Sequence, residues 1–348
     1  MRPASTGAPV CYRLAVIDTT NASFPRNTRI GRIAAIDLAR GWALIAMAIY
    51  HLAWDLEFFG YAEPGLTADG GWKLFARSIA SSFLFLVGVS LYLAHRNGVN
   101  WPSFGKRLAI VAAAAALITI ATYYLTPGAF VFFGILHQIA LASLLGLAFL
   151  RLPALPIAVI AAAIIALPFF YSSEIFNDPA LWWVGLSSIR PRSNDYVPLF
   201  PWFGVVLLGI AAAKLGEASG FFKTLSTWTP RRWTQPVDFI GRHSLSFYLI
   251  HQPVLIGLVW LATQIAPPAP VSHETRFVAA CSQSCGEERG AEFCSSYCGC
   301  MLDELRNDGT LATVLDQTQS EAQSMALRDK ITLCTFRTED ALSSGAAP

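Results

Sequence analysis

The chain has 348 residues, of which 54% are hydrophobic and only 14% are charged, and its mean hydropathy is +0.47. Charged residues make up about a quarter of a typical soluble domain, so this composition excludes an ordinary soluble protein and indicates an integral membrane protein. A formal net charge of +2 is too small to predict nucleic-acid binding, and no basic stripe with interleaved aromatic residues occurs. We therefore expect the lipid bilayer as a partner and no nucleic acid.

Residues 1–30 form a segment rich in Ser, Thr, Pro and Ala, and arginines lead from it into the first apolar run. Such a segment is either a cleaved signal peptide or a retained arm. The apolar run that follows is longer than the core of a signal peptide, and no small-residue cleavage site comes after it. We expect a retained, flexible cytoplasmic arm.

A helix needs about twenty apolar residues to cross a bilayer. Residues 31–267 contain seven apolar runs near that length, at 33–53, 74–94, 108–126, 130–150, 155–171, 197–213 and 238–266. They predict an all-α fold, a polytopic membrane helix bundle of about seven transmembrane helices.

Basic residues are concentrated in the N-terminal arm and in the loops that follow the even-numbered runs, where they include Arg96, Lys106, Arg107, Arg151, Lys214, Lys223, Arg231 and Arg232. Cytoplasmic loops are enriched in Lys and Arg, so we expect the N-terminus in the cytoplasm. An odd number of spans then places the C-terminus outside. In a bacterial inner membrane, the outside is the periplasm.

Residues 271–348 have the composition of a soluble segment, and six of the seven cysteines lie there. Cysteines four residues apart lie on one helix face, as in Cys281-x3-Cys285 and Cys294-x3-Cys298. Two such helices in a hairpin pair Cys281 with Cys298 and Cys285 with Cys294, which leaves Cys300 for Cys334. We predict a small α-helical disulfide-rich periplasmic tail, since disulfides persist in oxidising compartments.

A metal site is the alternative reading of these cysteines. Zinc sites favour Cys-x2-Cys spacing with histidines nearby, and this tail offers only His273. We therefore favour disulfides and expect no metal.

The first apolar run carries ionisable residues at both of its ends, and such residues are rare inside membranes. Asp37 and Arg40 are three apart, so they form either a local ion pair or part of a site in which Arg40 holds a phosphate. His51 and Asp55 are four apart at the other end. A carboxylate beside a histidine raises its basicity, as a general base requires; the alternative is an interfacial histidine beside Trp54.

Two further segments carry histidines. His137 and Gln138 lie in the fourth run, where they must face the bundle interior. In the last run, His243 lies near the cytoplasmic entrance, and His251 lies deeper, about 12 Å along a helix. A histidine packed in the interior with one hydrogen bond is the alternative reading of His251.

Three motifs carry a family resemblance: Ile36-Asp37-x2-Arg40-Gly41 with His51-x3-Asp55, then Gly134-Ile135-Leu136-His137-Gln138, and then Gly241-x2-Ser244-x3-Tyr248-x2-His251. Over about residues 32–265 the chain resembles the bacterial branch of the heparan-alpha-glucosaminide N-acetyltransferase catalytic-domain family. The resemblance implies a transmembrane acyltransferase-like domain that transfers an acetyl group from cytosolic acetyl-CoA to an amine or hydroxyl presented across the membrane.

The resemblance also implies roles for the polar residues. Arg40 and Arg242 are expected to hold phosphates of the acyl-CoA, with Asp37 and His243 beside them. His51, backed by Asp55, is expected to deprotonate the acceptor, and His137 and His251 are alternative bases or donors to the thioester carbonyl.

One feature of the eukaryotic pattern is missing. There, an asparagine stands where this chain has His51, and the key histidine follows in the next loop. No histidine occurs between Leu52 and Ala94 here, so His51 is a substitute candidate. For the acceptor we expect a cell-envelope sugar or glycan.

Other functions fit parts of the sequence. A small-molecule transporter would use the membrane histidines as a proton relay, but no internal repeat is found. A membrane anchor with the tail as a docking module leaves the membrane histidines and aspartates unexplained. Direct transfer and an acetyl-histidine intermediate both stay open, as does a homodimer.

Overall fold

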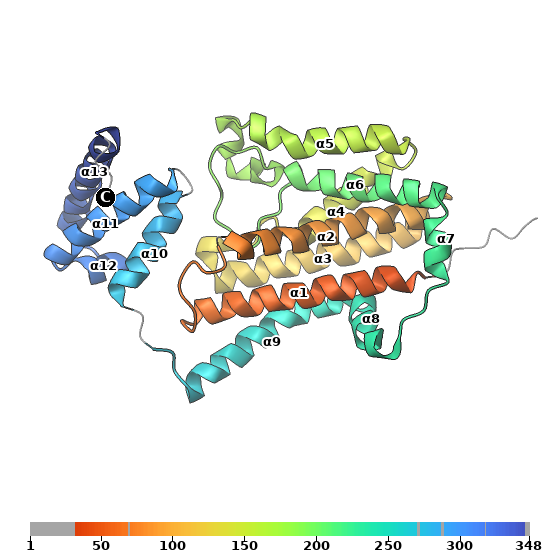
Figure 1. Cartoon of the computed structure of the whole chain (residues 1–348), viewed down its shortest axis with the longest axis horizontal. Helices are drawn as coiled ribbons and strands as arrows, with labels where there is room; N and C mark the ends of the chain where they lie inside the picture. The colour runs from red at the N-terminus through yellow and green to blue at the C-terminus, as the bar shows by residue number, and fades with distance from the viewer. Residues whose placement is uncertain (1–31, 69, 270–271, 287–288, 317, 345–348) are drawn as a thin grey trace, which may run out of the picture.

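The computed structural model describes residues 32–68, 70–269, 272–286, 289–316 and 318–344. The prediction of a cytoplasmic arm at 1–30 lies outside these residues. Figure 1 shows one large group of helices, numbered up to α9, followed by a smaller group from α10 to α13. Within the described ranges the chain is helical and contains no β-strand.

Seven helices of the large group match the seven predicted runs: α1 (Ala34–Phe58), α2 (Gly70–His95), α3 (Trp101–Leu125), α4 (Ile135–Gly146), α5 (Ala154–Phe170), α6 (Leu199–Ala218) and α9 (Ser244–Ile265). Five of them, α1, α2, α3, α6 and α9, are long and apolar enough to cross a membrane. The apolar segments that contain α4 and α5, Ile135–Phe149 and Ala154–Phe170, are shorter. The predicted helical membrane bundle is confirmed.

The bundle core forms around α6, which packs against α2 and α5. Val206, Leu207 and Ile210 on α6 are fully buried. Two glycines bring α2 and α6 into backbone contact, because a Cβ on Gly88 would lie 2.0 Å from the Val206 carbonyl oxygen and one on Gly209 would lie 2.2 Å from that of Phe85. Small residues permit such close approach of helices in membranes.

Two short helices, α7 (Phe221–Ser226) and α8 (Gln235–Arg242), connect α6 to α9. Figure 1 shows that α1 and α9 both begin at the end of the bundle where α7 and α8 lie, and that both run toward the end nearer the tail helices. α1 contacts both α8 and α9. This arrangement brings the first and last apolar runs side by side.

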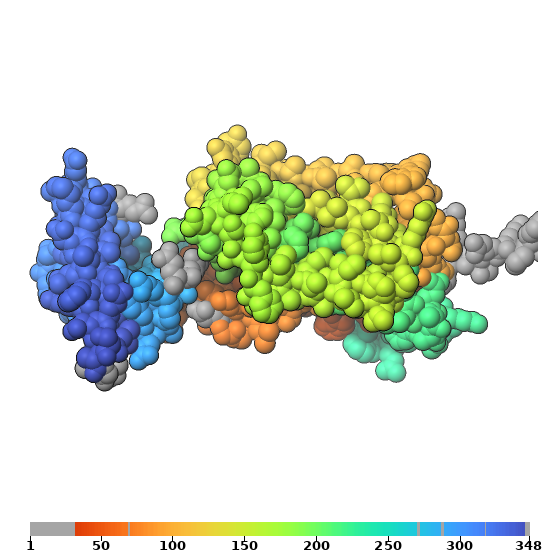
Figure 2. All heavy atoms as spheres, turned by 90° about the horizontal axis from the view of Figure 1, so that it is seen from above, coloured from red at the N-terminus to blue at the C-terminus, as the bar shows by residue number. Residues whose placement is uncertain are grey.

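The tail contains α10 (His273–Gly286), α11 (Ala291–Asn307), α12 (Leu311–Leu315) and α13 (Glu321–Ser343). Figure 2 shows it as a block separate from the bundle. All three predicted disulfides are present, Cys281–Cys298, Cys285–Cys294 and Cys300–Cys334, with Cα–Cα distances of 5.8, 5.6 and 5.7 Å. Each is worth about 2–4 kcal/mol in a small domain.

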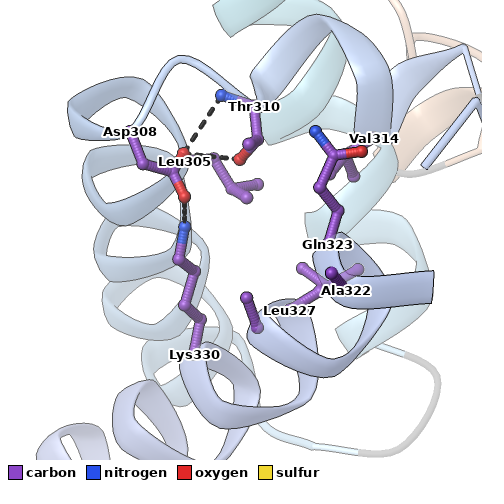
Figure 3. A pocket seen from close by; sticks show the side chains of 9 residues that line it. Leu305, Asp308, Thr310, Val314, Ala322, Gln323, Leu327 and Lys330 are labelled. Atoms are coloured by element: carbon purple, nitrogen blue, oxygen red, sulfur yellow. Dashed lines mark hydrogen bonds and ion pairs between the residues drawn. The ribbon is translucent and has the colours of Figure 1, made fainter. Parts of the chain in front are cut away.

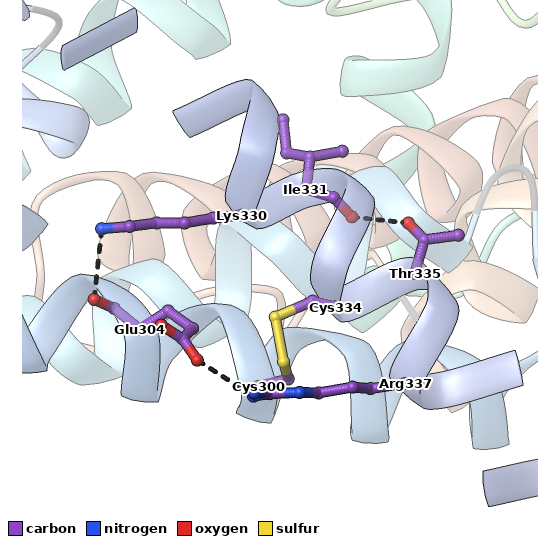
Figure 4. Close-up of a disulfide and its surroundings, with 7 residues drawn as sticks. All are labelled: Cys300, Glu304, Lys330, Ile331, Cys334, Thr335 and Arg337. Carbon is purple, nitrogen blue, oxygen red and sulfur yellow. Dashed lines mark hydrogen bonds and ion pairs between the residues drawn. A yellow bond between two sulfur atoms is a disulfide. The ribbon is translucent and has the colours of Figure 1, made fainter. Parts of the chain in front are cut away.

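The disulfide between Cys300 and Cys334 joins α11 to α13 beside a small polar network (Figure 4). Lys330 donates to the Glu304 carbonyl oxygen at 3.3 Å, and Arg337 forms an ion pair of 3.0 Å with the Glu304 carboxylate. Cys334 is fully buried and packs in a cluster with Phe277 and Met301. The disulfide and a small apolar core therefore hold the tail together.

These pairings predict the number of free thiols. Six of the seven cysteines are bonded, so Cys11 is the only one left to react. We expect the unfolded, unreduced protein, isolated without reductant, to take up one maleimide-polyethylene glycol adduct on a denaturing gel, and the reduced protein to take up seven. More than one adduct before reduction would contradict the disulfide assignment.

Candidate active site between α1 and α9

Two histidines face each other where α1 packs against α9. The rings of His51 and His251 have centroids 5.0 Å apart and are inclined at 60°. Their helices start at the same end of the bundle and contact each other, with His51 in the second half of α1 and His251 in the first half of α9. The sequence predicted both residues as site candidates, and the fold brings them together.

The hydrogen bonding of His251 fixes its tautomer. Its Nδ1 lies 2.7 Å from the Tyr248 carbonyl oxygen, which can only accept, so Nδ1 carries the proton. Nε2 is left with a lone pair, and it is buried without a hydrogen-bond partner in the described chain. The ring lies parallel to that of Phe247, with an interplanar angle of 3°. His251 therefore presents an oriented basic nitrogen in the bundle interior.

Asp55 joins the same two helices one turn further along. Its side chain is fully buried, and Oδ1 accepts a hydrogen bond of 2.7 Å from Nε2 of Gln252, the residue after His251. The sequence analysis expected Asp55 to support His51, but no hydrogen bond links these two side chains in the described residues. The carboxylate instead fixes α9, and its Oδ2 has no partner there.

His137 has both ring nitrogens engaged near the start of α4. Nδ1 accepts from the Gly134 amide at 3.2 Å, so Nε2 carries the proton and donates to the Thr119 hydroxyl, also at 3.2 Å. That hydroxyl in turn donates to the Val131 carbonyl at 2.7 Å. His137 therefore caps its own helix and ties it to α3, which favours a structural role for this residue over that of a base.

Asp195 is a polar residue of this region that the sequence analysis missed. It lies in the loop before α6, and its carboxylate accepts from the Ile135 amide at 2.8 Å, at the start of α4. A Cβ on Gly134 would lie 2.3 Å from this carboxylate, so the glycine of the Gly-Ile-Leu-His-Gln segment is needed for the contact. Burial raises the pKa of Asp195 to about 6.

A second group of predicted residues gathers at the α8 end of the bundle. The buried Asp37 carboxylate accepts from Arg40 at 2.9 Å and from Arg32 at 2.5 Å. Arg40 also donates to the Ser90 hydroxyl on α2. The ion pair offered as one reading of the Asp37 and Arg40 spacing is therefore present, and it fixes the Arg40 guanidinium.

Glycines place this group against α8. A Cβ on Gly241 would lie 1.8 Å from the Asp37 carbonyl oxygen, and one on Gly41 would lie 2.1 Å from that of Val237. The two glycines of the motifs are therefore required for the contact of α1 with α8. On α8, Arg242 forms an ion pair of 2.7 Å with Asp238, and the exposed His243 has Nδ1 3.0 Å from the Phe239 carbonyl.

Partnerless polar atoms mark the α1–α9 contact as the candidate site. Asp55 Oδ2, His251 Nε2 and Gln252 Oε1 are all buried without a partner in the described chain. Such groups cost about 1–3 kcal/mol each unless a water or ligand satisfies them. No group of three His, Cys, Asp or Glu residues in the described ranges is placed to hold a metal.

The tail has a cavity of about 220 Å³, but its polar groups already have partners (Figure 3). Asp308 accepts from the Thr310 amide and hydroxyl and from Lys330, and Gln323 accepts from the Ser320 amide. The remaining lining is apolar, so no side chain there is poised for chemistry.

The fold and the geometry of the site define a class of protein: a helical membrane bundle with a buried site made of histidine and carboxylate side chains. The catalytic-domain model of heparan-alpha-glucosaminide N-acetyltransferase matches residues 32–253, more than half of the chain. The chain belongs to this family of membrane acetyltransferases, as the motifs predicted. The match includes His51, Asp55 and His251 and excludes the tail. No curated protein and no solved structure matches the chain.

The bond from Gln252 to Asp55 yields a stability prediction. In Gln252→Ala the buried carboxylate loses its only partner in the described chain, and a hydrogen bond to a charged group is worth about 1.5–3 kcal/mol. We expect thermal unfolding in detergent to shift down by several degrees. The control is Gln264→Ala, an exposed glutamine on the same helix, which should unfold like the wild type. Equal midpoints for all three proteins would refute the contact.

Proposed function

We propose that this membrane acetyltransferase takes the acetyl group of acetyl-CoA and transfers it to an amine or hydroxyl of a cell-envelope sugar or glycan. Family membership supports acetyl transfer. The observation that carries the assignment of the site is the buried Nε2 of His251, which has its lone pair free on a ring whose centroid lies 5.0 Å from that of His51.

In the reaction that we propose, His251 Nε2 removes a proton from the acceptor amine or hydroxyl as the acceptor attacks the thioester carbonyl carbon. The new C–N or C–O bond forms, the C–S bond breaks, and the thiolate of the donor takes the proton back from His251. In this proposal His51 binds the reacting carbonyl or the acceptor, and the hydrogen bond between Asp55 and Gln252 holds α1 and α9 together.

The distance between the Arg40 cluster and the histidine pair supports a long acetyl donor. Arg40 and His51 are separated by eleven residues of α1, which is about 16 Å along a helix. A donor with a phosphate-bearing end and a thioester at the tip of a thin arm, as in acetyl-CoA, suits such a separation. We propose that the donor enters from the cytoplasmic side and that the acceptor comes from the periplasmic side of a bacterial inner membrane.

Two routes use the same nitrogen. In a two-step route, His251 Nε2 attacks the thioester itself and passes the acetyl group on. Acid quenching followed by mass spectrometry of the peptide that contains His251 distinguishes this route from direct transfer, because only the two-step route leaves an acetylated peptide.

The function is tested with purified protein in lipid nanodiscs, acetyl-CoA and a panel of amino sugars and hydroxyl-bearing envelope glycans, by release of free thiol. We expect the wild type to acetylate at least one acceptor. His251→Gln should lower kcat by about 10²–10⁴-fold, the usual effect of losing a general base. The histidine-matched control is His273→Gln in the tail, which should keep wild-type activity. Folded wild-type protein that releases no thiol with any acceptor would contradict the proposal.

A further inference from the structure

Two arginines from different helices, Arg40 on α1 and Arg107 on α3, lie at the end of the bundle near α8. Arg40 on α1 is held by Asp37 and Ser90. Arg107, in the second turn of α3, lines a cavity with His95, which follows Ser90 by five residues on α2. Arg107 forms no hydrogen bond or ion pair with any residue in the part of the chain that the structure describes. The fold therefore places both guanidinium groups near the last turns of α2, that of Arg40 fixed by Asp37 and Ser90 and that of Arg107 without a partner among the described residues.

A histidine completes this cluster. His95 is the last residue of α2, and its Nδ1 is buried without a partner among the described residues. Its ring packs edge-on against Phe104 with centroids 5.5 Å apart. His95, Arg107 and Ser143 line one small cavity between α2, α3 and α4.

The size of the cavity limits what it holds. Its volume is about 30 Å³, so a ligand can place only a small group there. The body of the ligand must lie outside, on the side where Arg107 is exposed.

Charge then indicates the kind of ligand. Like charges repel. Arg242 pairs with Asp238, and Arg96 pairs with Glu217, whereas Arg107 has no carboxylate partner in the described part of the chain. Asp37 is already shared between Arg32 and Arg40. An anion bound between Arg40 and Arg107 would relieve the repulsion. Guanidinium groups bind phosphate oxygens with two parallel hydrogen bonds, and an imidazole adds a third donor.

We propose that Arg107, together with Arg40 and His95, binds a phosphate group of the thioester donor. This inference rests on the proposed function. It places the entrance for the donor at the ends of α1, α2 and α3. The sequence instead suggested Arg242, which lies on α8, as one of the residues that hold the phosphates of the donor. A phospholipid headgroup carries the same phosphate chemistry, so the experiment must separate the two sources.

The test is calorimetric titration of CoA into the full-length protein in nanodiscs of phosphatidylcholine. Arg107→Gln should weaken the Kd for CoA about tenfold or more, and Arg107→Lys, which keeps the charge but not the fork of donors, should weaken it less. The matched control is Lys106→Gln, which removes the adjacent exposed cation on the same helix and should bind CoA like the wild type. Thermal unfolding must be unchanged in each variant.

Three results would overturn the inference. Equal CoA affinity of the wild type and Arg107→Gln would remove Arg107 from the donor site while leaving the acetyltransferase proposal intact. If Arg107→Gln keeps the CoA affinity of the wild type but loses the anionic phospholipid that co-purifies with it, the phosphate site binds a lipid. Absence of CoA binding to folded wild-type protein would instead remove the proposed function, and this inference with it.

Discussion

Polar side chains inside an apolar helix bundle need partners, because no solvent satisfies them there. In this protein, α1 carries side chains from both groups of candidate site residues. At one end, the Asp37 carboxylate binds Arg40 and Arg32 while the neighbouring backbone touches α8 at Gly241. Toward the other end, Asp55 binds Gln252 on α9. α1 therefore fixes the position of both elements that carry the last family motif.

This arrangement separates two kinds of chemistry along one helix. The basic cluster around Arg40 suits a charged group, and the pair of His51 and His251 suits proton transfer. Neither group is complete on one helix: Ser90 from α2 holds Arg40, and α9 supplies His251 with its tautomer fixed by the Tyr248 carbonyl. The close glycine contacts at Gly41 and Gly241 hold the elements near enough for these pairs to form.

The elements that follow from local pattern could be predicted from the sequence. Apolar runs predicted the seven helices because hydropathy is a property of consecutive residues. The run at 155–171 matches the length of α5, but the run at 130–150 is longer than α4, which is shorter than a full span. The spacing of four between cysteines gave the disulfide pairs, because side chains at that interval share a helix face.

Contacts between distant segments could not be predicted in the same way. Asp55 was expected to support His51 because both lie on one face of α1, but Gln252 from α9 takes its carboxylate. His137 was expected as an alternative base or as a donor to the thioester carbonyl, and in the structure its two nitrogens bind Gly134 and Thr119. Asp195 lies in a loop with no periodic signal, and only the fold brings it to the start of α4.

The central claim is that acetyl transfer takes place between α1 and α9. A structure of the protein with a non-reactive acetyl-CoA analogue tests it most directly. We predict that the carbonyl of the analogue lies between the rings of His51 and His251, within hydrogen-bond distance of one of them. A carbonyl bound beside His137, or on the far side of α8, would contradict this account.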